Sequence, residues 1–359
     1  MTDVATNSRK LWGIVLAAGE GARVRDFLQQ LCGGRGIKQF CAIVGRRSLL
    51  EHTLARVERL IPRERMLVVV STDHQEEVAQ QLAQWPAENV IDQPADRDTA
   101  PGILLPLAHL SRREPFATVA IFPSDHFILD EARFMAHVQR AVAETQRFPQ
   151  ELTLLGMTPD RAEEGYGWIE PGRKETWRGT LPVRQFWEKP DLPHTEQLLR
   201  RGAVWNTFVS VAQATTLWEM TRQTAPDLYR DFMALGRALG GPQAASVTEY
   251  IYRTLHAVNF SSGVCEVLPS RLRVLPVPAV GWSDWGSVDR IFASLEQLGK
   301  LNDCLARLKR QGKESPAPPL AAHAGETGLT THRHAPPMPL LQEGFPRHVT
   351  ARWQKSVEG

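Results

Sequence analysis

Residues 11–40 constrain the fold of this chain most, because in them a short apolar run ends in a glycine-rich loop. Residues 14–16, Ile-Val-Leu, have the continuous hydrophobicity of a strand that is buried on both faces of a parallel sheet. Gly19 and Gly21 follow that run, and glycines let backbone N–H groups approach an anionic ligand closely. Arg23 and Lys38 can neutralise phosphate oxygens. The stretch therefore predicts either a phosphate-binding turn or a plain tight turn in an α/β domain.

This turn lacks one mark of dinucleotide-binding proteins. Their fingerprint has a third glycine, and the chain has Val24 at that position. An acidic residue placed to bind the ribose is also not evident after the second expected strand. An NAD-binding protein is therefore disfavoured.

The composition is that of an ordinary globular protein. The chain has 359 residues, enough for one or two domains, with 42% hydrophobic residues, 23% charged residues and a formal net charge of +2. This balance gives no reason to expect nucleic acid or a membrane surface as a partner. The chain opens with polar residues, and its first apolar run is too short for the core of a signal peptide, so we expect a cytoplasmic location.

The cysteines and histidines indicate no metal centre of their own. The four cysteines show no CxxC pair and no histidines at ligand spacing, so neither a structural zinc site nor a disulfide framework is expected of Cys32, Cys41, Cys265 and Cys304. Several histidines fall in a proline-rich C-terminal stretch with little periodicity. We expect residues 309–359 to be a disordered tail and residues 1–9 to be a flexible N-terminus.

Strands and helices alternate over the first half of the chain. Apolar runs predict strands at 14–16, 42–44, 66–70, 89–91 and 118–122, and amphipathic spacing predicts helices at 49–60, 78–85 and 102–110. Such alternation favours a parallel sheet covered by helices on both faces.

The pattern changes after a further strand at 152–156. Short extended segments at 165–170 and 183–190, separated by proline and glycine, are typical of a small antiparallel insertion. The remaining pattern predicts a helix at 198–205, strands at 209–211, 264–268 and 273–277, and helices at 216–224, 227–239, 248–255 and 288–308. The last helix has the spacing to pack either on the body of the molecule or on a second subunit.

Asp125 follows the strand at 118–122. Ligands bind at the carboxyl ends of the strands in such sheets, so the Asp125 carboxylate would lie near a phosphate held by the loop after residue 16. It is a candidate Mg²⁺ ligand, because Mg²⁺ prefers carboxylate and phosphate oxygens. The alternative is that Asp125 only caps the next helix.

Taken together, the chain resembles the sugar-1-phosphate nucleotidyltransferases, and within them the guanylyltransferases that act on mannose 1-phosphate. The resemblance covers about residues 10–300. Six segments in the family's order carry it: LAAGEGAR (16–23), IKQF (37–40), DRDTAP (96–101), PSDH (123–126), EKP (188–190) and GWSDWGS (281–287). YGWIE (166–170) and WNTF (205–208) add weaker support.

The resemblance implies a fold and a reaction. The fold is a Rossmann-like α/β domain over residues 10–308, with a mixed, mostly parallel sheet, helices on both faces and a sugar-binding insertion at about 157–212. In the reaction, an oxygen of a sugar 1-phosphate attacks the α-phosphorus of a nucleoside triphosphate and pyrophosphate leaves. GTP and mannose 1-phosphate are the expected substrates, GDP-mannose the expected product and Mg²⁺ the expected cofactor. A homodimer is one arrangement open to such a domain.

The resemblance also implies a role for individual residues. Arg23, Lys38 and Asp125 are the expected catalytic residues, and Asp125 and Asp284 the expected metal ligands. The expected nucleotide-binding residues are Ala18, Gly19, Gly21, Arg23, Thr99, Ala100 and Pro101. Those expected to bind the sugar phosphate are Gly167, Glu188, Lys189 and Asn206.

The chain departs from the family pattern at several positions. The segment between Arg23 and Lys38 is long and glycine-rich, Asp98 stands where the family has Asn, and Thr207-Phe208 replaces a small Ser-Gly pair. These departures leave two alternatives open. One is the same reaction with another hexose 1-phosphate or nucleotide, and the other is a non-catalytic paralogue that binds sugar nucleotides and regulates a partner.

Overall fold

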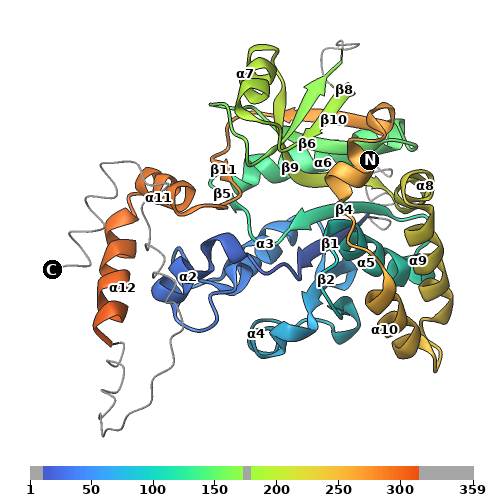
Figure 1. The fold of residues 1–359 in the computed structure, drawn as a ribbon, viewed down its shortest axis with the longest axis horizontal. Helices are drawn as coiled ribbons and strands as arrows, with labels where there is room; N and C mark the ends of the chain where they lie inside the picture. The colour runs from blue at the N-terminus through green and yellow to red at the C-terminus, as the bar shows by residue number, and fades with distance from the viewer. Residues whose placement is uncertain (1–10, 173–178, 315–359) are drawn as a thin grey trace, which may run out of the picture.

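A nine-stranded sheet runs through the computed structural model, which describes residues 11–172 and 179–314 (Figure 1). The strand order is β3-β2-β1-β4-β9-β6-β10-β8-β7. In chain order the strands are β1 (Leu11–Ala17), β2 (Met66–Ser71), β3 (Val90–Gln93), β4 (Thr118–Pro123), β6 (Leu152–Met157), β7 (Gly167–Pro171), β8 (Leu181–Glu188), β9 (Val204–Gln213) and β10 (Leu272–Val277).

The sheet is mixed. Strands β3, β2, β1 and β4 are parallel neighbours, and so are β6 and β10. Strand β9 lies between β4 and β6 and runs antiparallel to both, and β8 runs antiparallel to β10 and β7. This arrangement confirms the expected fold class, with antiparallel pairs in the half of the sheet that contains the insertion.

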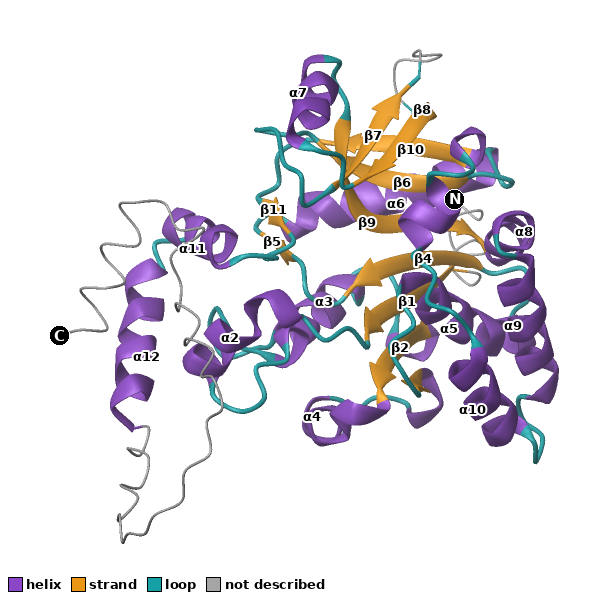
Figure 2. Ribbon diagram, in the orientation of Figure 1, coloured by secondary structure: helices purple, strands orange, loops and turns teal. Residues whose placement is uncertain are grey.

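Helices cover both faces of the sheet (Figure 2). They are α2 (Arg25–Cys32), α3 (Leu49–Val57), α4 (Gln75–Gln81), α5 (Thr99–Arg113), α6 (Glu131–Arg147), α7 (Leu192–Arg200), α8 (Ala214–Thr224), α9 (Pro226–Ala238), α10 (Ala244–Thr254), α11 (Val288–Gln297) and α12 (Leu301–Glu314). Buried side chains of α5, α8, α9 and α10 form a core with one face of the sheet, and those of α3 and α6 form a core with the other. Burial on both faces explains the unbroken apolar runs of β1 and β2.

A third core cluster lies beside the sheet and joins the two ends of the domain. Helices α2, α11 and α12 contribute its apolar side chains, which include Leu28, Leu295 and Leu305. Figure 1 shows α12 running alongside α2 at one side of the molecule. The last helical segment therefore packs on the body of its own chain, which is one of the two packing arrangements that its apolar spacing allowed.

A short antiparallel pair brings two distant motifs together. Strand β5 (Phe127–Ile128) pairs with β11 (Trp282–Ser283), so Trp282 lies opposite Ile128. The segment after residue 280 is thereby held beside the loop that follows β4. This pair was not expected from the sequence, because two residues give no periodicity to detect.

Several predicted elements are wrong. Residues 42–44 lie in a loop. Residues 264–268 form no strand, because 264 and 265 end a π-helical turn (Ser261–Cys265) and 266–268 lie in the turn after it. The predicted helix at 198–205 ends at Arg200 and gives way to β9. The predicted helix at 288–308 is two helices, because Gly299 adopts a left-handed conformation with φ 66° between them.

The predicted domain limits need one change. Helix α12 continues to Glu314, so residues 309–314 are helical and are not part of a disordered tail. The predictions for residues 1–9 and for the rest of the tail lie outside the described residues. In the described parts of the chain, no helix is both long and apolar enough to cross a bilayer.

Candidate active site

The loop after β1 brings the backbone close to Lys38. Gly21 has φ 58°, and a Cβ at this position would lie 2.7 Å from the Cβ of Lys38. A side chain is therefore excluded both by backbone conformation and by space. Gln39 donates from Nε2 to the carbonyl oxygens of Ala17 and Gly19, each at 2.8 Å, and so fixes the start of the loop.

Lys38 bridges the two predicted metal ligands. Its side chain is only 5% exposed, and Nζ lies 2.8 Å from Oδ2 of Asp125 at the end of β4. The same ammonium donates to the backbone carbonyl of Asp284. Three segments that are far apart in the sequence thus meet at one ammonium group, at the carboxyl ends of β1 and β4.

Asp284 is held by one of its two carboxylate oxygens. Oδ1 accepts hydrogen bonds from Tyr166 Oη at 3.1 Å, Arg290 Nη1 at 2.8 Å and the backbone N–H of Gly286 at 2.9 Å. The other oxygen, Oδ2, lies 3.8 Å from Nη2 of Arg23. The Asp284 side chain is 12% exposed, so its orientation is fixed inside the protein while Oδ2 faces the arginine of the glycine loop.

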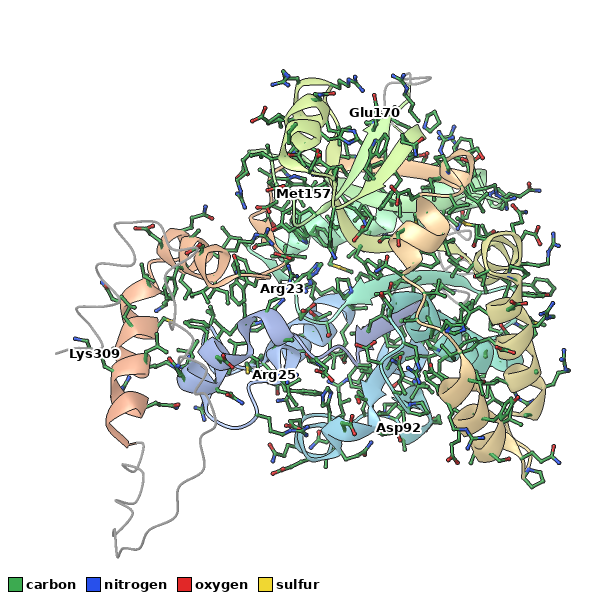
Figure 3. The ribbon with its side chains drawn as sticks, viewed as in Figure 1. Arg23, Arg25, Asp92, Met157, Glu170 and Lys309 are labelled. Atoms are coloured by element: carbon green, nitrogen blue, oxygen red, sulfur yellow. The ribbon has the colours of Figure 1, made fainter. Side chains whose placement is uncertain are left out.

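Two arginines approach Asp284 because residue 286 is a glycine. A Cβ there would lie 2.9 Å from Nη2 of Arg23 and 3.1 Å from Nη1 of Arg290. Arg290 also pairs with Glu163 and stacks over the ring of Tyr166, with 4.3 Å between its Cζ and the ring centroid. Arg23 itself is largely exposed and lies between α2 and the half of the molecule that holds Met157 (Figure 3).

Both carboxyl groups are ionised at neutral pH. Burial is the largest single effect on Asp125 and works to raise its pKa, but the charge of Lys38 together with smaller contributions from His126 and hydrogen bonds lowers the pKa below its usual value. Burial likewise works to raise the pKa of Asp284, and the charge of Arg290 is the largest of the effects that lower it. The neighbouring His126 is neutral, because burial lowers its pKa to about 4.

The carboxylate pair fits a hard cation that also binds substrate phosphates. The described residues contain no group of three or more His, Cys, Asp or Glu side chains that could hold a metal ion by themselves. Asp125 and Asp284 would offer two anionic ligands at the point where β1 presents its glycine loop. This donor set suits Mg²⁺, which is usually bound by one or two carboxylates together with phosphate oxygens and water.

A cavity of about 550 Å³ lies between the glycine loop and the start of α5. Among the residues that line it are Ala18, Gly19, Gln93, Asp98 and Thr99. Three of these five were predicted to bind the nucleotide: Ala18, Gly19 and Thr99. The predicted Ala100 and Pro101 are buried in the first turn of α5, beneath this cavity, and are not among its lining residues.

Three of the predicted sugar-phosphate residues lie together on β7, β8 and β9. A Cβ at Gly167 would lie 3.0 Å from Oε2 of Glu188 and 3.2 Å from the Cβ of Asn206. Burial raises the pKa of the Glu188 carboxyl. Lys189 is different, since its side chain is 57% exposed and its Nζ lies 3.6 Å from Oε1 of Glu188.

Unusual backbone conformations cluster in these segments. The non-glycine residues with positive φ in the described chain are Asp98, Lys189, Phe208 and Trp285. Each of the four either is a residue predicted to bind substrate or metal, or lies within two positions of one. Left-handed conformations are costly for such residues and concentrate at functional sites, which supports the assignment of this region as the active site.

The sequence did not single out the side chains that orient Asp284. Arg290 lies three residues into a helix after the GWSDWGS segment, with no motif of its own, and its role depends on a fold that brings Glu163 and Tyr166 next to it. Tyr166 belongs to the YGWIE segment, which could have drawn attention to it. Gln93 was also missed by the sequence analysis. This residue lines the cavity beside α5, and its Oε1 is buried without a hydrogen-bond partner in the described structure.

Known proteins share the sequence pattern of this chain. A family model described as nucleotidyl transferase matches residues 12–300. A mannose-1-phosphate guanylyltransferase from Escherichia coli K12 is 28% identical, and the match covers 82% of this chain and 62% of that protein. A mannose-1-phosphate guanylyltransferase from Klebsiella pneumoniae is 30% identical, with coverage of 76% and 58%. The chain thus spans about three fifths of the length of the curated relatives it matches.

Solved structures show the same fold. A protein described as a mannose-1-phosphate geranyltransferase from Thermus thermophilus superposes with a TM-score of 0.68 at 26% identity, over 79% of each chain. A Helicobacter pylori protein described as a mannose-6-phosphate isomerase superposes with a TM-score of 0.60 at 19% identity, over 76% of this chain and 99% of that one. The second likeness bears on the fold alone.

Proposed function

Because this chain belongs to the nucleotidyl transferase family, we propose that it transfers a nucleoside monophosphate from GTP to mannose 1-phosphate and releases pyrophosphate. The observation that carries this proposal is the cluster in which Lys38 joins Asp125 to the Asp284 segment beside the glycine loop. The names of the two guanylyltransferases described above support the choice of GTP and mannose 1-phosphate.

The proposed mechanism relies on positioning and charge. The glycine loop binds the triphosphate through backbone N–H groups, and an oxygen of the sugar phosphate attacks the α-phosphorus in line with the leaving pyrophosphate. Arg23 and Lys38 offset the negative charge that builds up on that leaving group. Since Lys38 is already buried and oriented by Asp125, little reorganisation is needed when the charge develops.

Asp125 and Asp284 are the proposed ligands of Mg²⁺, which when bound neutralises phosphate charge. Oδ2 of Asp284 takes no hydrogen bond from a described side chain, whereas Oδ1 takes two. Tyr166 and Arg290 therefore orient the carboxylate through Oδ1 and leave Oδ2 for the cation.

The sugar 1-phosphate is proposed to lie against Gly167, Glu188 and Asn206. The absence of a side chain at Gly167 gives the sugar access to the carboxylate and the amide, which hydrogen-bond its hydroxyl groups. Lys189, exposed beside Glu188, is placed to pair with the phosphate of an incoming substrate.

A different base or hexose is the second candidate. Gln93 donates from Nε2 to the carbonyl of Ala95 at 2.9 Å, which directs its Oε1, an acceptor, away from that bond. An acceptor here suits the N–H donors of guanine, but uracil and thymine also present one such donor.

A panel assay tests the proposal and separates its alternatives. Pyrophosphate release is measured with GTP, UTP, dTTP and ATP, each combined with mannose 1-phosphate and glucose 1-phosphate in the presence of Mg²⁺. The proposal expects the highest kcat/KM for GTP with mannose 1-phosphate. A higher value for another pair would identify the second candidate, and binding of GDP-mannose with no release from any pair would identify a non-catalytic regulator.

A further inference from the structure

Three of the four cysteines lie in or against the third core cluster. Cys32 ends α2, Cys41 follows the short 3₁₀ helix Lys38–Phe40, and Cys304 lies in α12. All three are free thiols. None of them has a part in the proposed transfer reaction.

Cys32 lies beside a fixed arginine. Its Sγ is 3.7 Å from Nη2 of Arg307 and 3.7 Å from the carbonyl oxygen of Ala42. Arg307 cannot easily turn away, because it also donates to the carbonyls of Ala42 at 2.9 Å and Ile43 at 3.1 Å. A guanidinium held next to a sulfur atom favours the thiolate, which is the nucleophilic form of cysteine.

Cys41 directly precedes Ala42, whose carbonyl oxygen lies 3.7 Å from the Cys32 sulfur. The Cys41 side chain is also the largest influence on the pKa of Cys32, which it lowers. Cys32 is half-buried and within reach of solvent, whereas Cys41 is 6% exposed and its pKa is raised by Cys32 and by burial. The two thiols therefore differ in a way that suits an attacking and a resolving cysteine.

The other two thiols are poorer candidates. Cys304 is 2% exposed, and burial raises its pKa to about 12. Cys265 belongs to a different core cluster, on the face covered by α5 and α9, and burial raises its pKa as well.

We propose that Cys32 and Cys41 form an oxidisable dithiol, which reacts with a low-molecular-weight disulfide and closes into an intramolecular disulfide bond around the segment that carries Lys38. The bond would join the end of α2 to the residue that follows the Lys38–Phe40 helix. Gly33, Gly34 and Gly36, all with positive φ, lie inside this closed segment. The oxidised form would therefore restrict the glycine-rich segment that leads to Lys38.

The chemistry takes two exchange steps. The Cys32 thiolate attacks one sulfur of the small disulfide, forming a mixed disulfide and expelling one small thiolate, which takes up the proton that Cys32 has lost. The Cys41 thiol then loses its proton and attacks Sγ of Cys32, which expels the second small thiolate. Two protein thiols are oxidised, and one small disulfide is reduced to two thiols.

Peptide mapping of the wild-type protein tests the proposal without any assay of activity. The native protein is incubated with oxidised glutathione, remaining thiols are blocked, and the protein is digested with trypsin without reductant. Trypsin cuts after Arg25, Arg35, Lys38 and Arg46, so the two cysteines fall on separate peptides, 26–35 and 39–46. We expect these peptides to be joined in most molecules and released by dithiothreitol, while Cys265 and Cys304 remain blocked as free thiols.

Two variants separate the roles of the thiols. In Cys41→Ser, peptide 26–35 should carry one glutathione, because the resolving thiol is missing. In Cys32→Ser, peptide 39–46 should stay unmodified, with Cys265→Ser as the matched control that still forms the joined peptide. The proposal is overturned if Cys32 stays free in the wild-type protein, or if it joins Cys304 instead of Cys41.

Discussion

Lys38 shows how burial decides between two interpretations of a loop residue. Because the segment before it is long and glycine-rich, the sequence also allowed Lys38 to be exposed to solvent, where its pairing with phosphate would be screened and weak. Instead, its side chain is 5% exposed and ion-paired with Asp125. An ammonium placed in this way is preorganised for charge that appears during the reaction.

Replacing Lys38 by Met should therefore act mainly on the chemical step. We expect kcat to fall on the order of 10²-fold or more, as when one preorganised donor is removed from a developing anion, with a smaller change in KM for GTP. Steady-state kinetics measure both values. Lys309→Met, at an exposed position on α12, is the matched control and should leave both unchanged (Figure 3). A normal kcat with a few-fold rise in KM would make Lys38 a peripheral contact.

Arg290 gives a test of how Asp284 is oriented. Its guanidinium holds Oδ1 of Asp284 at 2.8 Å and is anchored by Glu163. Arg290→Met should raise the Mg²⁺ concentration needed for half-maximal rate by about 10–100-fold, the usual cost of losing a partner of a metal ligand. Arg222→Met, which breaks only an exposed ion pair with Glu219, is the control. An unchanged Mg²⁺ dependence in the Arg290 variant would show that Asp284 does not need this support.

Burial of His109 should make the stability of the folded protein depend on pH, and this residue lies outside the proposed active site. Burial lowers its pKa in the folded protein from 6.5 to about 4, so the unfolded chain binds a proton at a higher pH than the folded one. The folded state is therefore penalised progressively as pH falls from 6.5 toward 4, and not above 6.5. Thermal midpoints of the wild type and of His109→Gln should run parallel above pH 6.5, and below it the wild type should fall more steeply. Parallel curves down to pH 4 would contradict the assigned pKa.

The residues of the site differ in how far the sequence could reveal them. Asp125 could be predicted because a carboxylate at the end of an apolar strand in an α/β sheet points to the binding edge. Lys38 could be proposed from its charge after the glycine-rich loop, whereas Asp284 needed the family resemblance, since it does not follow a predicted parallel strand. Arg290 could not be predicted by either route, because its role depends on tertiary contacts with Asp284 and Glu163 that no local pattern shows.

At the scale of elements, α12 joins the two ends of the domain. Arg307 donates to carbonyls of the segment at 42–43, and Leu305 is packed against α2 and α11. The sequence showed the amphipathic spacing of this segment but not the element it packs against. That element is α2, which lies in the segment between Arg23 and Lys38 that the sequence marked only as long and glycine-rich.

Leu305→Ala should lower stability by about 2–5 kcal/mol, because it leaves a cavity in this cluster. Thermal or urea unfolding measures the change, and Lys309→Ala on the exposed side of the same helix is the control. A change below 1 kcal/mol, roughly the cost of a surface substitution, would mean that α12 is only loosely attached to the domain.

The errors among the predicted elements have physical causes. Residues 264–268 are mostly apolar like a strand, but the first two of them end a π-helical turn, and a short apolar run does not distinguish a strand from such a turn. No element was predicted at 131–147, where α6 lies, because its polar residues hide a stripe that includes Phe134, Val138 and Ala141. In contrast, the helix predicted from residue 49 does begin there, since the Ser48 hydroxyl forms a capping box with Glu51.

At the scale of the whole molecule, the domain places three binding regions along one edge of the sheet. The cavity beside α5, the Lys38 cluster and the group of Gly167, Glu188 and Asn206 lie on segments that follow or belong to β1, β4 and the antiparallel strands. The alternation of strands and helices was enough to predict this edge. The antiparallel insertion of β9 between β4 and β6 was not predictable, because strand order depends on contacts between distant segments.

The most direct test of the account is pyrophosphate release from GTP and mannose 1-phosphate by the wild type and by Asp125→Asn and Asp284→Asn. Each substitution keeps the side-chain size but removes a charge from the proposed Mg²⁺ site. We expect Mg²⁺-dependent release by the wild type, loss of that activity with EDTA, and loss of most turnover in both variants with their folds retained. Near-normal turnover in either variant, or release by the wild type that EDTA does not affect, would contradict the account.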